Sequence, residues 1–336
     1  MPQHHWIDQN PFPLEQGGVL DHLEITYHTY GKWRPGVRVV WVCHALTANS
    51  DCADWWSGLV GDGQYFDPLR DFIVCANIIG SCYGSSGPLT EHPQVGKPYF
   101  SNFPKVTIRD MVRAHDLLRE HLGITRIDVA LGGSMGGYQV MEWAVMYPER
   151  IKRMVLLVTG ASESAWGQAI HATQRMAIEN DPTWCDPAPE AGRAGLMTAR
   201  ALGMLTYRNY ETFVATQSNP EPVLEGHRAE SYVAYQGQKL ADRFHAYSYW
   251  ILSLAMDGHH VGRERGTVKQ VLSQVQVPAL VIGISSDILC PPPEQRALAF
   301  MLPQGQFIKI DSPYGHDGFL LEYAQISKEI DRFLKG

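Results

Sequence analysis

The feature that most constrains the fold of this chain is the run Gly-Gly-Ser-Met-Gly-Gly at residues 132–137, which lies between an apolar run and a helical pattern. A chain that turns sharply from a strand into a helix leaves no room for side chains two residues before and after the serine. Gly132 and Gly136 occupy those two positions. Such a turn lifts the Ser134 hydroxyl clear of the sheet and points the positive end of the helix at it. We therefore predict that Ser134 is a nucleophile at a strand–turn–helix junction.

Strands and helices alternate on both sides of this turn. β-branched and apolar runs predict strands, and residues 107–122, 138–147 and 322–334 have helical spacing. The expected strands are residues 37–43, 72–79, 127–131, 155–158, 279–284 and 306–310. This alternation predicts an α/β fold with a mostly parallel sheet flanked by helices.

The pattern changes between residues 161 and 262, where helical periods dominate and no convincing strand is found. We therefore expect one α/β core, formed by residues 1–160 and 263–336. A helical lid of residues 161–262 is expected to be inserted between the two parts.

Composition and charge exclude several classes of function. The 336 residues include 28 Lys and Arg against 35 Asp and Glu, so the net charge of −7 leaves no basic surplus for nucleic acid. No apolar run approaches the roughly 18 residues of a membrane span, and the first residues lack a signal-peptide pattern. The six cysteines form no CxxC pair and the histidines form no HExxH motif. We expect a cytoplasmic protein with reduced thiols, no metal site and no bound cofactor.

A serine hydroxyl needs a base and an orienting acid to act as a nucleophile. Asp287 follows the expected strand 279–284, and His316 follows the strand 306–310. Both residues therefore belong at the carboxyl ends of strands, where α/β sheets place their sites. The chain order Ser134, Asp287, His316 is the order found with this type of serine turn. We predict a Ser-His-Asp triad.

The oxyanion formed when Ser134 attacks a carbonyl needs hydrogen-bond donors already in place. We predict that one donor is the backbone N–H of Met135 and that the other is the N–H of Leu46, in the loop after strand 37–43. His44 in the same loop is interpreted as a structural residue.

Several motifs together resemble the homoserine O-acetyltransferases, from about residue 13 to residue 333. They are HALTANSDCADWW (44–56), GSCYGSSGP (80–88), TIRDMVRAHDLL (107–118), GGSMGG (132–137), LTYRNYETF (205–213) and GHDGFL (315–320). The resemblance implies an α/β-hydrolase core with a helical lid and a homodimer formed through the lid. It also implies acetyl transfer from acetyl-CoA to the hydroxyl of L-homoserine, a step of methionine biosynthesis.

The resemblance also implies roles for individual residues. Ser134 would carry the acetyl group in a ping-pong reaction, with Asp287 orienting His316. Arg208 would hold the carboxylate of the substrate and Asp317 its ammonium group. An arginine suits a carboxylate because its planar guanidinium donates two parallel hydrogen bonds.

The residues themselves leave alternatives open. The same triad would serve an esterase or a thioesterase. Succinyl rather than acetyl transfer, or serine rather than homoserine as the acceptor, would differ by only a few pocket residues.

Overall fold

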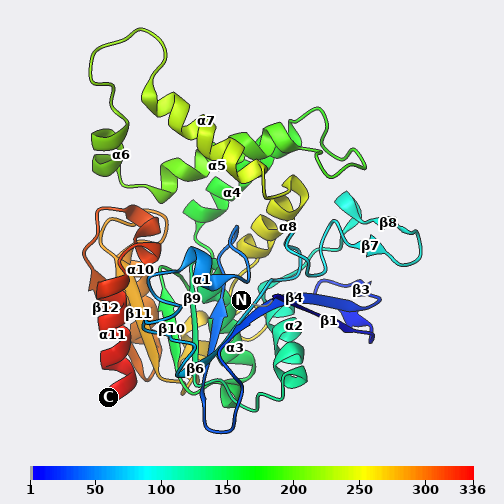
Figure 1. Ribbon diagram of the computed structural model, residues 1–336, viewed down its shortest axis with the longest axis vertical. Coiled ribbons are helices and arrows are strands. Elements are labelled where there is room, and N and C mark those ends of the chain that lie inside the picture. Colours follow the sequence, from blue (N-terminus) through cyan, green and yellow to red (C-terminus); the bar gives the residue numbers. More distant parts are fainter. Residues whose placement is uncertain (1–2) are drawn as a thin grey trace.

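The molecule is built on an eight-stranded sheet with helices on both faces (Figure 1). The computed structural model describes residues 3–336. The strand order across the sheet is β1-β4-β6-β5-β9-β10-β11-β12, and neighbours are parallel except in the pairs β1–β4 and β4–β6. The strands are β1 (Gln3–Asp8), β4 (Leu23–Tyr30), β5 (Arg38–Cys43), β6 (Asp71–Ala76), β9 (Val129–Gly133), β10 (Met154–Leu157), β11 (Ala279–Ile284) and β12 (Gly305–Ile310).

The central strands are mostly apolar because the sheet is covered on both faces. Every residue of β6, β9, β10 and β11 is buried, as expected for strands of a covered parallel sheet. The apolar residues divide into two cores, one on each face of the sheet. One core includes α2 (Ile108–His121), α3 (Met135–Met146) and α10 (Pro292–Met301), and the other includes α1 (Cys52–Trp55) and α11 (Tyr323–Lys335).

The boundaries of α2 show how local sequence sets an element. Thr107 and Asp110 form a reciprocal capping box that satisfies backbone N–H groups at the start of the helix. The helix ends at His121, and Gly123 adopts a φ of 67°, a left-handed conformation that glycine tolerates. The predicted helix 107–122 and its glycine stop are confirmed.

Other predicted elements are confirmed with shifted ends. The strand expected at residues 72–79 is shorter, because β6 ends at Ala76 and the chain then turns. The helix expected at residues 138–147 begins three residues earlier, because the glycines after Ser134 already have helical backbone. No strand was expected at β1 or β4, which form the antiparallel edge of the sheet.

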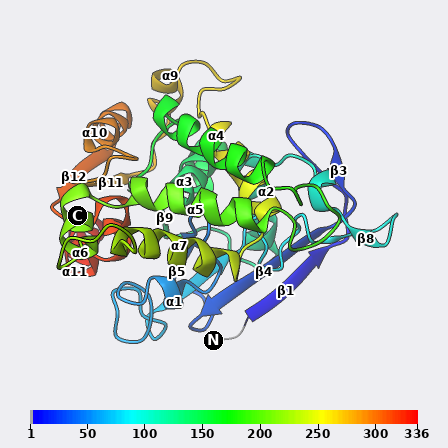
Figure 2. The same ribbon diagram turned by 90° about the horizontal axis from the view of Figure 1, so that it is seen from above.

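Six helices lie between β10 and β11 in the chain, and the first five form a layer beyond the carboxyl ends of the parallel strands (Figure 1). These five are α4 (Ala165–Glu179), α5 (Arg193–Tyr207), α6 (Tyr210–Gln217), α7 (Arg228–Ala241) and α8 (Ala246–Asp257). Seen from above, α4, α5 and α7 run side by side (Figure 2). Residues 161–262 contain no strand, as predicted, and we propose that they form the lid over a core of residues 1–160 and 263–336.

The remaining elements are short connections. They are the hairpins β2 (Phe12–Pro13) with β3 (Val19–Leu20) and β7 (Glu91–His92) with β8 (Lys97–Pro98), the helix α9 (Val268–Leu272), and the 3₁₀ turns Phe100–Asn102, Pro148–Arg150 and Gly315–Leu320. Within residues 3–336, none of the helices combines the length and the apolar character needed to cross a bilayer.

Candidate active site

Ser134 lies in a strained turn between β9 and α3. Its backbone has φ 55° and ψ −126°, which non-glycine residues rarely adopt and which costs about 1–3 kcal/mol. A Cβ atom at Gly132 would collide with the backbone of Gly136, and one at Gly136 would collide with the carbonyl group of Cys43. The carbonyl of Ser134 accepts a hydrogen bond from the Thr159 hydroxyl at 2.9 Å. The predicted strand–turn–helix junction and its need for two glycines are confirmed.

The structure brings Asp287 and His316 together, as the sequence predicts. Nδ1 of His316 lies 2.8 Å from Oδ2 of Asp287, and the two residues are only 4% and 3% exposed. Oδ1 of Asp287 accepts hydrogen bonds from the backbone N–H groups of Leu289 and Cys290, at 2.8 and 3.0 Å. Because a carboxylate only accepts hydrogen bonds, it fixes the proton of His316 on Nδ1. The other ring nitrogen, Nε2, is buried and makes no hydrogen bond within residues 3–336.

The surroundings of His316 set its proton affinity. Burial alone would lower the pKa of this imidazole, but the charge of Asp287 and the hydrogen bond to it outweigh burial. The pKa of His316 is therefore raised above its ordinary value of 6.5. An imidazole with a raised pKa is a stronger base toward a hydroxyl proton.

A cavity of about 310 Å³ places Ser134 and His316 on a common wall. It lies between the core and the helices α4 to α8, and residues of both parts line it. The lining residues are Ala45, Leu46, Thr47, Ala48, Asn49, Asp54, Trp55, Ser134, His171, Arg200, Tyr207, Arg243, Met256, Leu289, His316, Asp317, Phe319 and Leu320. We therefore expect Nε2 of His316 to accept the proton of the Ser134 hydroxyl.

The predicted oxyanion donors lie on two elements that are tied together beside Ser134. Leu46 lines the cavity, and Met135 is the first residue of α3, so its N–H has no partner within the helix. Nε2 of Gln139 donates to the carbonyls of His44 at 3.1 Å and Met135 at 3.3 Å. Burial lowers the pKa of His44 to about 4, and its Nε2 accepts a hydrogen bond from the backbone N–H of Ile78 at 3.1 Å. His44 is thus a neutral residue that anchors the loop.

A second arginine, besides the Arg208 that the resemblance implies, is a candidate partner for a substrate carboxylate. Arg208 is not among the lining residues, and its guanidinium lies 3.4 Å from Oδ2 of Asp317. Arg200 lines the cavity, and its guanidinium lies 5.4 Å from the ring centroid of Tyr207. Sequence reasoning missed Arg200, although it precedes Tyr207 by seven residues and so lies on the same face of α5.

Asp317 lies in the cavity beside this arginine pair, as expected from its place after His316. Burial raises the pKa of its carboxyl, while the nearby charges of Arg208, His316 and Arg200 counteract part of the rise. The cavity therefore offers a cation and a carboxyl group as separate binding partners.

Cys290 lies close to the His–Asp pair. Ligand-type atoms of Asp287, Cys290 and His316 lie within 4.8 Å of one another. Burial raises the pKa of the Cys290 thiol well above its usual value, so the sulfur keeps its proton and is a poor metal ligand. Because Asp287 and His316 also bind each other, the arrangement fits a proton-transfer pair better than a metal centre.

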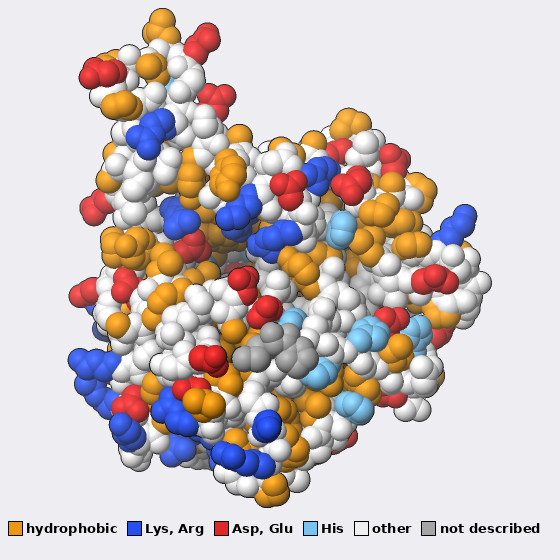
Figure 3. Space-filling view, viewed as in Figure 1, with side chains coloured by type: hydrophobic (Ala, Val, Ile, Leu, Met, Phe, Trp, Pro, Cys, Tyr) orange, Lys and Arg blue, Asp and Glu red, His pale blue; other side chains and the backbone are white. Residues whose placement is uncertain are grey.

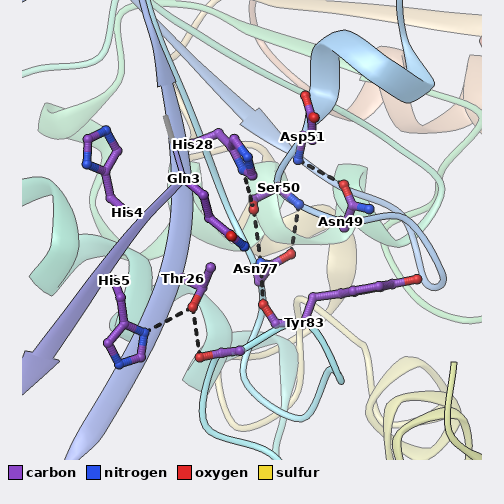
Figure 4. Close-up of a pocket in the computed structure, with 11 residues that line it drawn as sticks. Gln3, His4, His5, Thr26, His28, Asn49, Ser50, Asp51, Asn77 and Tyr83 are labelled. Atoms are coloured by element: carbon purple, nitrogen blue, oxygen red, sulfur yellow. Dashed lines mark hydrogen bonds between the residues drawn. The ribbon is translucent and has the colours of Figure 1, made fainter. Parts of the chain in front are cut away.

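A second cavity, of about 390 Å³, shares Asn49 with the first but contains none of the predicted catalytic residues (Figure 4). Its polar walls hydrogen-bond mainly to one another. Nδ1 of His28 lies 2.8 Å from the Ser50 hydroxyl, and the amide of Asn77 donates to the same hydroxyl at 2.9 Å. These contacts buttress the loop that carries Asn49.

Comparisons with known proteins agree with this geometry. Residues 38–323 match the family described as alpha/beta hydrolase fold. The chain is 44% identical over 334 residues to the homoserine O-acetyltransferase of Cyclobacterium marinum, covering 99% of this chain and 95% of the relative.

Solved structures support the same fold. A homoserine O-acetyltransferase from Bacillus anthracis superposes with a TM-score of 0.92 at 22% identity, covering 100% of this chain and 98% of that chain. The esterase E22 superposes with a TM-score of 0.88 at 21% identity, covering 99% and 100% of the two chains. The fold alone therefore does not separate transferases from esterases. The identity to a curated relative over nearly the whole length does, and the chain belongs to the homoserine O-acetyltransferase family.

Proposed function

We propose that the protein transfers an acetyl group from acetyl-CoA to the hydroxyl of L-homoserine by a ping-pong mechanism. The observation that carries this proposal is one cavity lined by Ser134, by His316 with Asp287 behind it, by a cation and by a carboxyl group. A hydrolase needs only the serine and the His–Asp pair, whereas an amino-acid acceptor also needs the cation and the carboxyl group.

In the first half-reaction, Oγ of Ser134 attacks the thioester carbonyl while Nε2 of His316 takes the hydroxyl proton. The N–H groups of Leu46 and Met135 would stabilise the tetrahedral oxyanion. When the intermediate collapses, the C–S bond breaks and His316 returns the proton to the departing CoA sulfur. An acetyl ester on Ser134 remains.

In the second half-reaction, L-homoserine replaces CoA in the cavity. His316 takes the proton of the homoserine hydroxyl as that oxygen attacks the acetyl ester. His316 then returns the proton to Ser134 Oγ, and O-acetylhomoserine leaves. The imidazole therefore ends each cycle as it began, held by Asp287.

The charged groups of the cavity fit the two ends of an amino acid. We assign the carboxylate to Arg200, because Arg200 lines the cavity whereas Arg208 does not and pairs with Asp317. The ammonium group is assigned to Asp317, as the resemblance implies. Arg208 then acts through Asp317, whose carboxylate it holds.

The donor brings phosphate groups to the mouth of the cavity. Figure 3 shows basic side chains on the lid side of the hollow between the lid and the core, with acidic side chains below them. Arg243 is an exposed residue of the α7–α8 connection that lines the cavity and donates to the carbonyl of Thr47 at 2.6 Å. We assign it to the anionic part of CoA.

The experiment that tests the proposal measures thiol release from acetyl-CoA and from succinyl-CoA. Each donor is offered with L-homoserine, with L-serine and with no acceptor. Release that requires acetyl-CoA and L-homoserine together supports the proposal. Release without an acceptor would instead make the protein a thioesterase. Release with succinyl-CoA or with serine would keep the triad and the ping-pong mechanism, but would show that the donor or the acceptor, and so the roles of the pocket residues, had been assigned wrongly. The methionine pathway, a cytoplasmic location and a homodimer formed through the lid follow from the family as further proposals.

A further inference from the structure

A second histidine–aspartate pair lies in the wall of the same cavity, opposite the core and unused by the mechanism above. His171 of α4 lines the cavity although it is only 4% exposed. Its Nδ1 lies 2.7 Å from Oδ1 of Asp257, the last residue of α8. Oδ2 of Asp257 accepts a hydrogen bond from the guanidinium of Arg175 at 2.6 Å.

These contacts fix the hydrogen-bonding character of His171. Since a carboxylate paired with Arg175 only accepts hydrogen bonds, Nδ1 of His171 must carry a proton. In the neutral imidazole with its proton on Nδ1, Nε2 is an acceptor, and no group within residues 3–336 hydrogen-bonds to it.

The charges around this pair disfavour an anionic ligand. Glu163 lies 4.0 Å from Nδ1 of His171, and its Oε2 accepts a hydrogen bond from the Tyr138 hydroxyl at 3.0 Å. Asp257 lies directly behind the ring and is balanced by Arg175. The cations that line the cavity, Arg200 and Arg243, belong to other elements, whereas the charged groups within 4.0 Å of the His171 ring are two carboxylates.

We propose that His171 is a specificity-determining residue that accepts a hydrogen bond, through Nε2, from the ammonium group of the amino-acid acceptor. This inference rests on the proposed function. An ammonium group has three N–H donors, so it can bind Asp317 and still offer a donor to His171. Asp257 acts as a positioning residue because it keeps Nε2 in its acceptor form.

The test compares two acceptors that differ only in the ammonium group, L-homoserine and 4-hydroxybutanoate. The ratio of their kcat/KM values is measured for the wild type and for His171→Leu. A hydrogen bond to a charged group is worth about 10- to 100-fold in an equilibrium constant, so the ratio should fall by about that factor. The fall should come from homoserine alone, mainly through KM.

Two further variants separate recognition from packing. His171→Gln offers an amide oxygen near the position of Nε2, so it should recover part of the preference for homoserine and covers the case in which the leucine variant fails to fold. His245→Leu removes another histidine of the lid, one that contacts the carbonyl of Pro189 and does not line the cavity. This control should leave the ratio unchanged.

The results distinguish a failure of the role proposed for His171 from a failure of the proposed function. If His171→Leu slows both acceptors equally, or also slows the first burst of CoA release in the absence of an acceptor, His171 is structural and the inference is wrong. If the wild type shows no acceptor-dependent CoA release at all, the proposed function fails and the inference fails with it.

Discussion

Replacing Arg200 by alanine should separate acetyl transfer from acetyl-CoA hydrolysis. Arg200 lines the cavity, whereas Arg208 does not. A bidentate contact with the carboxylate of homoserine would supply two charge-assisted hydrogen bonds, each worth about 1.5–3 kcal/mol. Losing both costs about 3–6 kcal/mol, or roughly 10²–10⁴ in kcat/KM for homoserine. Water needs no carboxylate partner, so hydrolysis should continue at the wild-type rate.

The assay follows thiol release from acetyl-CoA with and without L-homoserine, and Arg208→Ala is the matched variant. Arg208 pairs with Asp317 at 3.4 Å and lowers the pKa of that carboxyl. Without Arg208, the pKa of Asp317 should rise further, so homoserine binding should weaken most at low pH and recover as the pH rises. A larger, pH-independent loss of transfer in Arg208→Ala than in Arg200→Ala would refute the assignment of Arg200. It would restore Arg208 as the carboxylate partner.

Four further predictions concern the triad, the turn and the assembly. Ser134→Ala should lower kcat by about 10⁴–10⁶, measured as steady-state CoA release. The acid limb of the kcat/KM profile should lie above pH 6.5, because the raised pKa of His316 keeps it protonated below that pH; in Asp287→Asn the limb should move to lower pH while kcat falls about 10⁴-fold. Gly136→Ala should lower the free energy of unfolding by about 1–3 kcal/mol in a denaturant titration, whereas Gly258→Ala, where a Cβ meets no atom closer than 3.5 Å, should not. Light scattering after size exclusion should give twice the chain mass of 37.6 kDa, and a monomer would refute the homodimer.

The parts of the fold that the sequence predicts best are those in which local pattern and burial agree. The strands β5 and β11 were found within one residue of their ends because both are apolar runs buried on both faces of the sheet. β1 was missed because it is an edge strand, QHHWID, that alternates exposed and half-buried residues. Four of its six residues are polar, which is unusual for a strand. Its partner β4 has the sequence LEITYHTY, in which a glutamate, a histidine and two threonines interrupt the apolar residues, so it does not read as an apolar run.

The site divides in the same way. Ser134 was identified because a strained turn requires glycines at fixed positions, so the nucleophile lies in a recognisable local motif. Asp287 and His316 were identified from the order of the strands that they follow. Arg200 and His171 belong to no such motif. Each lies within an ordinary helix and lines the cavity only because the lid packs on the core.

This division matters because Arg200 and His171, which no sequence motif identifies, are residues that we propose separate a transferase from a hydrolase. The triad and the fold are compatible with both, and an esterase superposes on this chain with a TM-score of 0.88. Water is present at about 55 M, whereas an acceptor near a typical KM of ~1 mM is ~10⁴–10⁵ times scarcer, so transfer needs an advantage of about 6–7 kcal/mol. Holding an acceptor in place can supply about 7–11 kcal/mol, but only if groups bind both of its ends. Those groups must come from the lid as well as from the core, so the choice between water and homoserine depends on tertiary packing that no single motif encodes.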